Sequence, residues 1–454
     1  EAPLQLAWTK NVGANIYMTS PLVHNGRVYI ASVDENLKGE GHVYALAGED
    51  GEISGTLEIQ YFVGGYGDAW WKWVIEDFKK AYPNVEIVEY AGSDVNETMK
   101  PNWISGNPPD VVYIDGAGLS ETEMVEDDLL MDLTDWYQSL VLEDGKSLAE
   151  HFLVDPSNFD GKVYTLPLVF DTRGVWYDAK WFRDKGFEVP TDYDSWMASM
   201  KMIQESEGIA PLGATGVYPS VFLKGVMYPA FVSEGGTELL ERLIDGEEGA
   251  WSSPETLAVM KKVEEMQKAG FIDPGFAALT HTESQMIFLS HGNAYVTTGL
   301  WLPKEMDGSI PGDFEFGMTP TPMNDPGEIM PVIPDIHPVA IAKGAKNPAA
   351  AKAFVEHIFT LNAAEKMAEV SGSMMNIQGI DLASNEKVPE YLVTASEMIA
   401  DETKVELISL THAMSNDLMT PIGNELVSLM LGDITAEEFC ENAENAAAFY
   451  RSSK

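Results

Sequence analysis

The feature that most constrains the fold is a regular exchange of strand and helix patterns that begins near Gly55. Residues 56–63, TLEIQYFV, have the pattern of a strand, and the run GGYG at 64–67 breaks it. Residues 68–83 follow a helical spacing with Asp68 as the expected N-cap. The next two strands are predicted at 84–91 and 106–116. Strands that alternate with helices predict βαβ units and a parallel sheet, so the fold class is α/β.

The rest of the chain continues as a mixture of helices and strands. Residues 176–292 are mostly helical in pattern, and a strand-like run follows at 293–301. A proline-rich stretch at 318–338 precedes a strand, turn and helix at 339–360, and the remaining residues have helical spacing. From the length of 454 residues alone, we expect about three structural domains of 100–200 residues each.

The residue pattern of 1–52 differs from that of the rest of the chain. They contain two alternating strand patterns, and the turn signal Asn25-Gly26 precedes the first of them. These strands are predicted at 27–32 and 42–46. The segment resembles one blade of the quinoprotein-type β-propellers, but no second copy follows and one blade cannot bury its own faces. We therefore expect an orphan β segment. We expect no calcium site in the loop at 34–39, because Lys38 occupies a ligand position.

The charge balance excludes several kinds of partner. The chain has 28 Lys and Arg against 72 Asp and Glu, a formal net charge of −44. A field of that sign repels nucleic acid and anionic membranes. The single cysteine, Cys440, excludes a disulfide framework and a cysteine-rich metal site, and we expect it to be buried in a C-terminal helix. No run of 18 apolar residues is present, so no membrane span is predicted.

Motifs of the common catalytic sites are missing from the sequence. It has no G-x-S-x-G elbow, P-loop, H-E-x-x-H or C-x-x-C. Its GGYG run lacks the glycine spacing of a dinucleotide loop, and its histidines do not pair as in a zinc helix. A glycosidase needs two carboxylates at a fixed distance, and such a pair cannot be recognised in a sequence with 72 acidic residues. We therefore expect no metal, no cofactor and no catalytic residues, and a function that is not enzymatic.

Four stretches carry a family resemblance, in order along most of the chain. They are GGYGDAW with the following YPNVEIV, then NPPDVVYID, then DGKVYTLPLVFDTRGVWYDAKWF, and last FLSHGNAYVTTGLW with PTP and KNPAAAKAFVEHIF. From about Gly55 onward the chain resembles the extracellular carbohydrate-binding proteins of ABC transporters, the family of maltose-binding protein. The stretches GAWSSPETL, LTHTESQ and TGLWLPKEMDGSIPGDFEFGMTPTP are similar to the branch of N-acetylglucosamine and chitobiose receptors.

The resemblance implies a two-lobed periplasmic-binding-protein type II fold with a cleft between the lobes, in addition to the short N-terminal β segment at 1–52. Lobe 1 is expected to comprise 53–170 and about 338–400. Lobe 2 is expected to comprise 171–337 and about 401–454. Such folds bind ligand in a crevice at the carboxyl ends of the strands and close over it by hinge motion.

The resemblance also implies ligand-binding residues in lobe 1. Gly65 and Tyr66 follow the first strand, Trp70 opens the next helix, and Asp115 ends the third strand. Sugars need aromatic faces for their C–H surfaces and polar partners for their buried hydroxyls. Core packing is the alternative for Trp70, and a helix cap is the alternative for Asp115.

Further site residues are implied at the hinge and in lobe 2. Asp171 aligns with the hinge carboxylate that binds sugar in maltose-binding protein, although it is shorter by one methylene; an ion pair with Arg173 is the alternative. Trp301, after VTTG, aligns with a stacking tryptophan of the second lobe. The return hinge and a later turn add Asp335, His337 and Asn376.

The chain departs from the family pattern near its C-terminus. Residues 410–419 contain no aromatic residue where maltose-binding protein has a second stacking tryptophan, so we expect fewer rings or a substitute in Tyr218 or Tyr228. The run THTESQ, which holds His281, Glu283 and Gln285, is interpreted as a helix start.

The predicted function is a carbohydrate receptor that captures a mono- or oligosaccharide by hinge closure and delivers it to an ABC permease. The finer resemblance implies N-acetylglucosamine or a chito-oligosaccharide as ligand. The resemblance implies a monomer outside the cytoplasm, in the periplasm or anchored to the membrane. We expect a processed or trimmed chain, because it begins at Glu1 without Met, so the missing signal peptide does not argue for the cytoplasm. Two alternatives remain: a carbohydrate-active enzyme that uses Asp115 and Asp171, and an adhesion or scaffold protein built on residues 1–52.

Overall fold

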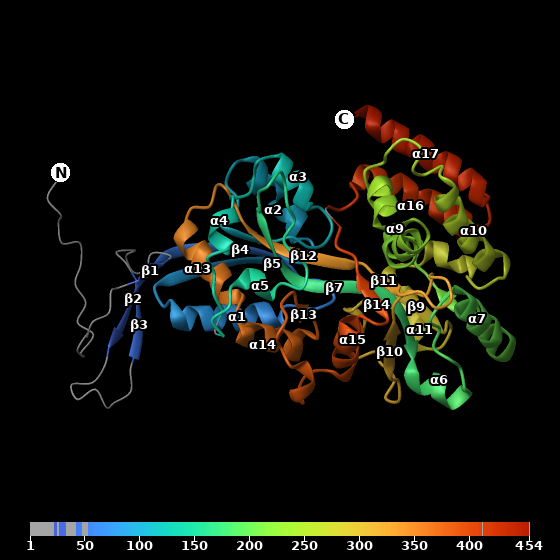
Figure 1. The fold of residues 1–454 in the computed structure, drawn as a ribbon, viewed down its shortest axis with the longest axis horizontal. Helices are drawn as coiled ribbons and strands as arrows, with labels where there is room; N and C mark the ends of the chain where they lie inside the picture. Colours follow the sequence, from blue (N-terminus) through green and yellow to red (C-terminus); the bar gives the residue numbers. More distant parts are fainter. Residues whose placement is uncertain are drawn as a thin grey trace.

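The computed structural model describes residues 22–24, 27–32, 42–47, 53–142, 144–410 and 412–453. The N-terminal strands form a three-stranded antiparallel sheet in the order β1-β2-β3, drawn in blue to one side of the molecule in Figure 1. These strands are β1 (Leu22–His24), β2 (Arg27–Ser32) and β3 (His42–Ala47). The two predicted strands are confirmed and β1 was missed, whereas the loop at 34–39 lies outside the described residues.

Figure 1 shows the remainder as two lobes joined by a narrow waist. Lobe 1, as we use the name, is the part built on the parallel strands β4, β5 and β6. Helix α1 covers this sheet with Trp70, Trp71 and Phe78, which the predicted helical spacing places on one face. The bounds are β4 (Gly55–Phe62), α1 (Ala69–Ala81), β5 (Val85–Gly92) and β6 (Val111–Tyr113). Asp68 is the N-cap residue of α1, as predicted, but its side chain makes no cap hydrogen bond and instead pairs with Lys72 at 2.5 Å.

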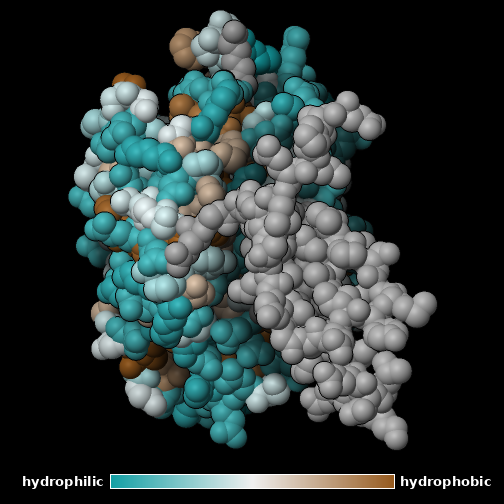
Figure 2. Space-filling model, turned by 90° about the vertical axis from the view of Figure 1, so that its left-hand side faces the viewer, coloured by the Kyte–Doolittle hydropathy of each residue, from teal (hydrophilic) through white to brown (hydrophobic). Residues whose placement is uncertain are grey.

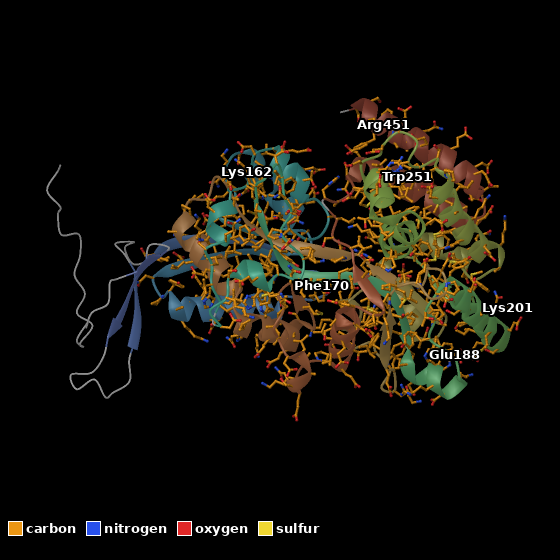
Figure 3. The ribbon with its side chains drawn as sticks, viewed as in Figure 1. Lys162, Phe170, Glu188, Lys201, Trp251 and Arg451 are labelled. Atoms are coloured by element: carbon orange, nitrogen blue, oxygen red, sulfur yellow. The ribbon has the colours of Figure 1, made fainter. Side chains whose placement is uncertain are left out.

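One long strand, β7 (Thr165–Asp178), runs through the waist into lobe 2. Its first half pairs with β12 (Pro334–Ile341), and its second half pairs with β9 (Tyr295–Gly299) and β10 (Phe316–Thr319). The result is one mixed sheet in the order β5-β4-β6-β12-β7-β9-β8. Phe170, labelled at the waist in Figure 3, is fully buried on β7.

Lobe 2 is mostly helical, and its core contains Trp251, labelled in Figure 3 among these helices. Cys440 is 6% exposed in the last helix, as expected from the sequence. The larger helices of this lobe are α6 (Ala179–Lys185), α7 (Tyr193–Glu207), α9 (Tyr228–Ile244), α10 (Pro254–Lys268), α11 (His281–Leu289), α16 (Asn416–Leu431) and α17 (Ala436–Ser453). Reciprocal hydrogen bonds between Thr280 and Glu283 begin α11, so the predicted helix start at THTESQ is confirmed.

The remaining elements complete both lobes and their connections. Helices α13 and α14 pack against α1, and α15 packs against β10. The further bounds are α2 (Val95–Ile104), α3 (Glu121–Glu126), α4 (Thr134–Tyr137), α5 (Leu148–His151), β8 (Leu212–Gly213), α8 (Ser220–Phe222), the π-helical turn η1 (Leu223–Met227), η2 (Pro274–Ala278), α12 (Leu302–Glu305), β11 (Met330–Val332), α13 (Pro348–Ile358), α14 (Leu361–Ser371), β13 (Met374–Met375), η3 (Leu382–Ser384), α15 (Glu390–Ala400) and β14 (Val405–Leu407).

The face shown in Figure 2 is mostly hydrophilic outside the grey atoms, with apolar residues scattered singly. Such a surface accords with the large negative charge of the chain. Among the helices of the described residues, none combines the length and the apolar character that a membrane span requires.

Candidate ligand-binding site at the hinge

Asp171 lies where β7 changes partners between the lobes. It pairs in register with Asp335 of β12, while Arg173 already pairs with the lobe-2 strand β9. Its side chain is fully buried, and Oδ1 accepts hydrogen bonds from the backbone N–H groups of Thr172 and Leu300, each at 2.8 Å. Its Oδ2 has no hydrogen-bond partner among the described residues. Asp171 therefore links the hinge strand to lobe 2 and keeps one acceptor free.

The ion pair expected as an alternative between Asp171 and Arg173 does not form within the described part of the chain. Arg173 instead donates to Oδ2 of Asp335, and the ammonium of Lys224 lies 3.4 Å from Oδ1 of the same carboxylate. Burial would raise the pKa of Asp335, but the two cations hold it well below its usual value. Asp335 therefore fixes both cations at the hinge.

His337 connects Asp115 and Asp171. Its Nδ1 lies 3.2 Å from Oδ1 of Asp115, and its Nε2 lies 3.7 Å from Oδ2 of Asp171. Burial opposes protonation of His337, yet the two carboxylates raise its pKa well above the usual value. We call the six side chains that meet here the hinge charge cluster. Its members are Asp115, Asp171, Arg173, Lys224, Asp335 and His337.

Trp301 contacts both lobes. Its Nε1–H donates to Nε2 of His281 at 2.9 Å, and the guanidinium of Arg173 lies 5.2 Å from its ring centroid. Gly65 of lobe 1 approaches it so closely that a Cβ at this glycine would lie 3.0 Å from the Trp301 Cβ. Gln285 donates to Glu305, which lies 3.3 Å from His281. His281 and Gln285 are thus supports for the tryptophan, a role that the sequence pattern did not indicate.

The other predicted lobe-1 residues differ in their burial and in their hydrogen bonds. Tyr66 is partly buried and its hydroxyl has no partner among the described residues; burial and the nearby Asp171 raise its pKa well above the usual value. Trp70 is 2% exposed in the core, and its indole N–H donates to the Ala363 carbonyl at 2.8 Å. Gly65, Tyr66, Trp70 and Asp115 nevertheless line one small cavity of about 370 Å³.

Asn376 is not brought to the hinge charge cluster. It is fully buried, its Oδ1 accepts from the backbone N–H of Val154 at 3.1 Å, and its Nδ2 donates to the carbonyl of Val154 at 2.8 Å. Both ends of its amide are used to hold the 153–155 segment. The physical reason for the difference is that a buried amide satisfies its hydrogen bonds locally when a backbone segment runs beside it.

A larger cavity adjoins Arg173 and Asp335 and is lined from both lobes. We call it the interlobe cavity. Of the two tyrosines expected to replace the missing stacking tryptophan, Tyr228 lines it and Tyr218 is 51% exposed outside its lining. Further lining residues that we use below are Glu121, Asp155, Ser157, Thr165, Lys224 and Met414.

Lys224 reaches the interlobe cavity because it lies in the π-helical turn η1. The turn packs against the hinge strands through Gly225, where a Cβ would lie 2.4 Å from Cγ2 of Thr297 and 3.3 Å from the Arg173 Cβ. Single π turns are rare and occur often at functional sites. The sequence analysis missed Lys224 and Glu121, because neither stands at the end of a predicted strand.

The described residues contain no group of three or more side chains suited to hold a metal ion. What converges at the hinge is a set of hydrogen-bonding groups, two cavities and one tryptophan reached from both lobes. Such a site can bind a polar, uncharged or weakly charged small molecule and respond to it by lobe movement.

Comparison with known proteins places this site in a family. The family model described as bacterial extracellular solute-binding protein matches residues 64–362. The chain belongs to this family. Membership confirms the family predicted from the sequence and implies a location outside the cytoplasm.

Individual relatives agree with this assignment. The chain is 25% identical over 335 residues to the diacetylchitobiose binding protein NgcE of Streptomyces coelicolor, covering 71% of this chain and 70% of that protein. It is 21% identical over 325 residues to a multiple sugar-binding protein of Streptococcus mutans, covering 69% and 73%. A solved chitin oligosaccharide binding protein matches with a TM-score of 0.70 at 19% identity, covering 87% and 98%. The last comparison confirms the predicted type II two-lobed fold.

Proposed function

We propose that the protein is an extracytoplasmic carbohydrate receptor of an ABC transporter and that its ligand is an amino-sugar oligosaccharide of the chitobiose class. It captures the sugar between its lobes and presents the closed form to a membrane permease. We further propose that it acts as a monomer held at the outer face of the membrane.

The observation that carries this proposal is a set of buried polar atoms around the hinge that have no hydrogen-bond partner among the described residues. They belong to Tyr66 (hydroxyl), Asp171 (Oδ2), Arg173 (Nε) and Tyr228 (hydroxyl). A buried donor or acceptor left unpaired costs about 1–3 kcal/mol, so a ligand rich in hydroxyls gains by pairing them. Trp301 adds an indole for the C–H face of a sugar ring.

The amino-sugar class is supported by the relatives and by the sequence. One relative is named for diacetylchitobiose and one structural neighbour for chitin oligosaccharides. The runs LTHTESQ and TGLWLPKEMDG, which carry the finer resemblance, hold His281 and Trp301. These two side chains are hydrogen-bonded to each other at the hinge, so the resemblance falls on the proposed site itself.

The alternative of an enzyme that uses Asp115 and Asp171 is less well supported. A general acid needs a raised pKa. Burial would raise the pKa of Asp115, but His337 lowers it, and the Gly116 N–H donates to the same carboxylate at 2.6 Å. A carboxylate stabilised in this way accepts hydrogen bonds from hydroxyls more readily than it delivers a proton.

The test is a thermal-shift screen against N-acetylglucosamine, diacetylchitobiose, maltose, and xylo- and manno-oligosaccharides, with product analysis of each mixture. A ligand at 100 times its dissociation constant should stabilise the protein by about 2.7 kcal/mol, which raises Tm by a few degrees. We expect the largest shift with diacetylchitobiose and no product. Turnover of an oligosaccharide would favour the enzyme, and a shift with maltose alone would reject the amino-sugar class.

A further inference from the structure

The lobe-1 wall of the interlobe cavity carries acidic and hydroxyl side chains. Its members are Glu121, Asp155, Ser157 and Thr165. Glu121 is the first residue of the short helix α3, and Thr165 is the first residue of β7. Asp155 and Ser157 lie in the loop that precedes β7, so three segments of the same lobe form the wall.

Glu121 is a partly buried carboxylate without a cation beside it among the described residues. Its two oxygens accept from the hydroxyls of Ser157, at 3.0 Å, and of Thr165. No lysine, arginine or histidine of the described residues forms an ion pair with it or with Asp155, the other carboxylate of the wall. Burial raises the pKa of Glu121, and the two hydroxyls only partly offset this. A buried charge that is hydrogen-bonded but unpaired is costly, and a cation brought by a ligand would relieve the cost.

The cations of the opposite wall already have a carboxylate as partner. These two cations, Arg173 and Lys224, share the carboxylate of Asp335. A ligand carboxylate would have to displace Asp335 from both of them. The lysine and arginine of the lining stand against the three carboxylates Glu121, Asp155 and Asp335, and the cavity is acidic by formal charge. The lining also includes His412, whose Nε2 lies 2.7 Å from the carboxylate of Asp245.

A second observation shows that the cavity is built for a ligand. Tyr228 lines it, is 4% exposed, and its hydroxyl has no hydrogen-bond partner in the described part of the chain. A ligand that fills the cavity can pair this hydroxyl on one side and meet Glu121 on the other. The charge of the whole chain adds to the selection, because a net charge of −44 raises the local concentration of cationic solutes.

We propose that the interlobe cavity takes a sugar unit with a free, protonated amine, and that this ammonium binds the carboxylate of Glu121. The proposal rests on the proposed function and adds, within its amino-sugar class, a preference for sugars with at least one amine that is not acetylated. An ammonium has three donors and forms charge-assisted hydrogen bonds with a carboxylate, which are about twice as strong as neutral ones. An N-acetyl group at the same position would bring no charge to Glu121.

The experiment compares two disaccharides of the same backbone by titration calorimetry at about pH 6, where ordinary amines are protonated. One is the disaccharide of glucosamine with both amines free, and the other is its diacetylated form. Each is titrated into the full chain, into Glu121→Gln, and into Glu126→Gln. Glu126 is an exposed residue of the same helix, outside the cavity lining, so its variant matches the loss of one negative charge. Circular dichroism and Tm establish that both variants are folded.

We expect Glu121→Gln to weaken binding of the free-amine disaccharide by about tenfold or more, as the loss of a charge-assisted contact requires. Glu126→Gln should leave that affinity within about twofold, because an exposed charge at this distance is screened. The diacetylated disaccharide should bind the wild type and Glu121→Gln equally.

Three results would overturn the proposal. Equal weakening by both variants would show a long-range effect of net charge and no contact at Glu121. Tight binding of the diacetylated form without binding of the free amine would reject the free amine and leave the proposed function intact. Binding of neither disaccharide by the wild type would reject the amino-sugar function together with this inference.

Discussion

Arg173 and Lys224, on one side of the interlobe cavity, share the carboxylate of Asp335, whereas Glu121 on the other side has no cation beside it among the described residues. Both regions are largely withdrawn from water, so desolvation acts on both. They differ in whether the protein itself supplies the opposite charge. Where it does, the side chains hold the hinge together. Where it does not, the open partner position is left to a ligand.

This difference has a consequence for mutagenesis. Changes in the hinge charge cluster should act mainly on the free energy of unfolding, because each removes a partner from groups that remain buried. Changes at the cavity wall or at Trp301 should act mainly on ligand affinity. The variants below test this separation from the largest expected effect to the smallest.

The largest effect is expected for Asp335→Ala. The change leaves Arg173 and Lys224 close together without their shared carboxylate, and we expect the free energy of unfolding to fall by about 3 kcal/mol. Because the pKa of Asp335 is held well below its usual value, its carboxylate stabilises the folded wild type above about pH 4. This stabilisation is lost as the pH falls further. Urea denaturation at neutral and acidic pH measures both.

The control is Glu315→Ala, which removes the carboxylate of another arginine pair. Arg183 and Glu315 lie 2.5 Å apart, but their side chains are 61% and 51% exposed. An exposed pair contributes at most about 1 kcal/mol. If both variants lose the same stability, burial of the hinge charge cluster is not the reason for its effect, and the comparison between the two regions fails.

Much of the fold could be predicted from the sequence, because local residue patterns indicate its strands and helices. The strand and helix alternation after Gly55 gave the lobe-1 sheet, and the helical spacing of 68–83 gave α1 with Asp68 as its N-cap residue. The side chain of Asp68 makes no cap hydrogen bond, because an exposed lysine one turn later pairs with the same carboxylate. Residue types alone do not determine which partner such a carboxylate takes.

The site was predictable only in part. Asp115, Asp171, Arg173, Asp335 and His337 stand at or within strands that meet at the hinge, so a resemblance based on strand ends could find them. Glu121 begins a short helix and Lys224 lies in a π-helical turn, and neither position has a signature in sequence. Asn376 was predicted from its neighbourhood, yet its amide is engaged by Val154, a contact between residues that are 222 positions apart.

Trp301→Ala should have the second largest effect, and this effect should be a loss of ligand affinity. Loss of the indole should weaken the binding of diacetylchitobiose by at least about tenfold, because stacking on a sugar face is lost. The fold should persist, since the indole N–H is bonded only to His281 among the described residues. Calorimetry and thermal unfolding measure the two effects separately.

Trp136→Ala is the matched control for Trp301. Trp136 lies in lobe 1, where Lys352 approaches its ring at 5.4 Å. Neither tryptophan is in the lining of the two cavities, but Trp301 contacts His281 and Arg173 at the hinge. The variant Trp136→Ala should leave the affinity for the sugar unchanged. Unchanged affinity of Trp301→Ala would remove Trp301 from the site and leave the proposed function to the polar groups alone.

The last variant, His337→Gln, should lower the free energy of unfolding like the other changes in the hinge charge cluster, and it should in addition change the pH dependence of stability. The pKa of His337 is raised in the folded protein, so its contribution to stability is complete below about pH 6.5 and is lost as the pH rises through the folded value. One proton changes the free energy of unfolding by at most about 1.4 kcal/mol per pH unit. Glutamine cannot titrate, so the decline of wild-type stability above neutral pH should flatten in the variant.

His357 provides the opposite sign within the same molecule. Burial lowers its pKa despite the carboxylate of Asp77 at 3.3 Å, so its neutral form is favoured and stability falls as the pH drops below about 6.5. His357→Gln should therefore flatten the acidic side of the profile, and His337→Gln the alkaline side. Urea denaturation from about pH 5 to 9 distinguishes them. A pair of profiles that shift in the same direction would mean that His337 is not held charged between Asp115 and Asp171, and that the hinge carries an unpaired carboxylate like that of the lobe-1 wall.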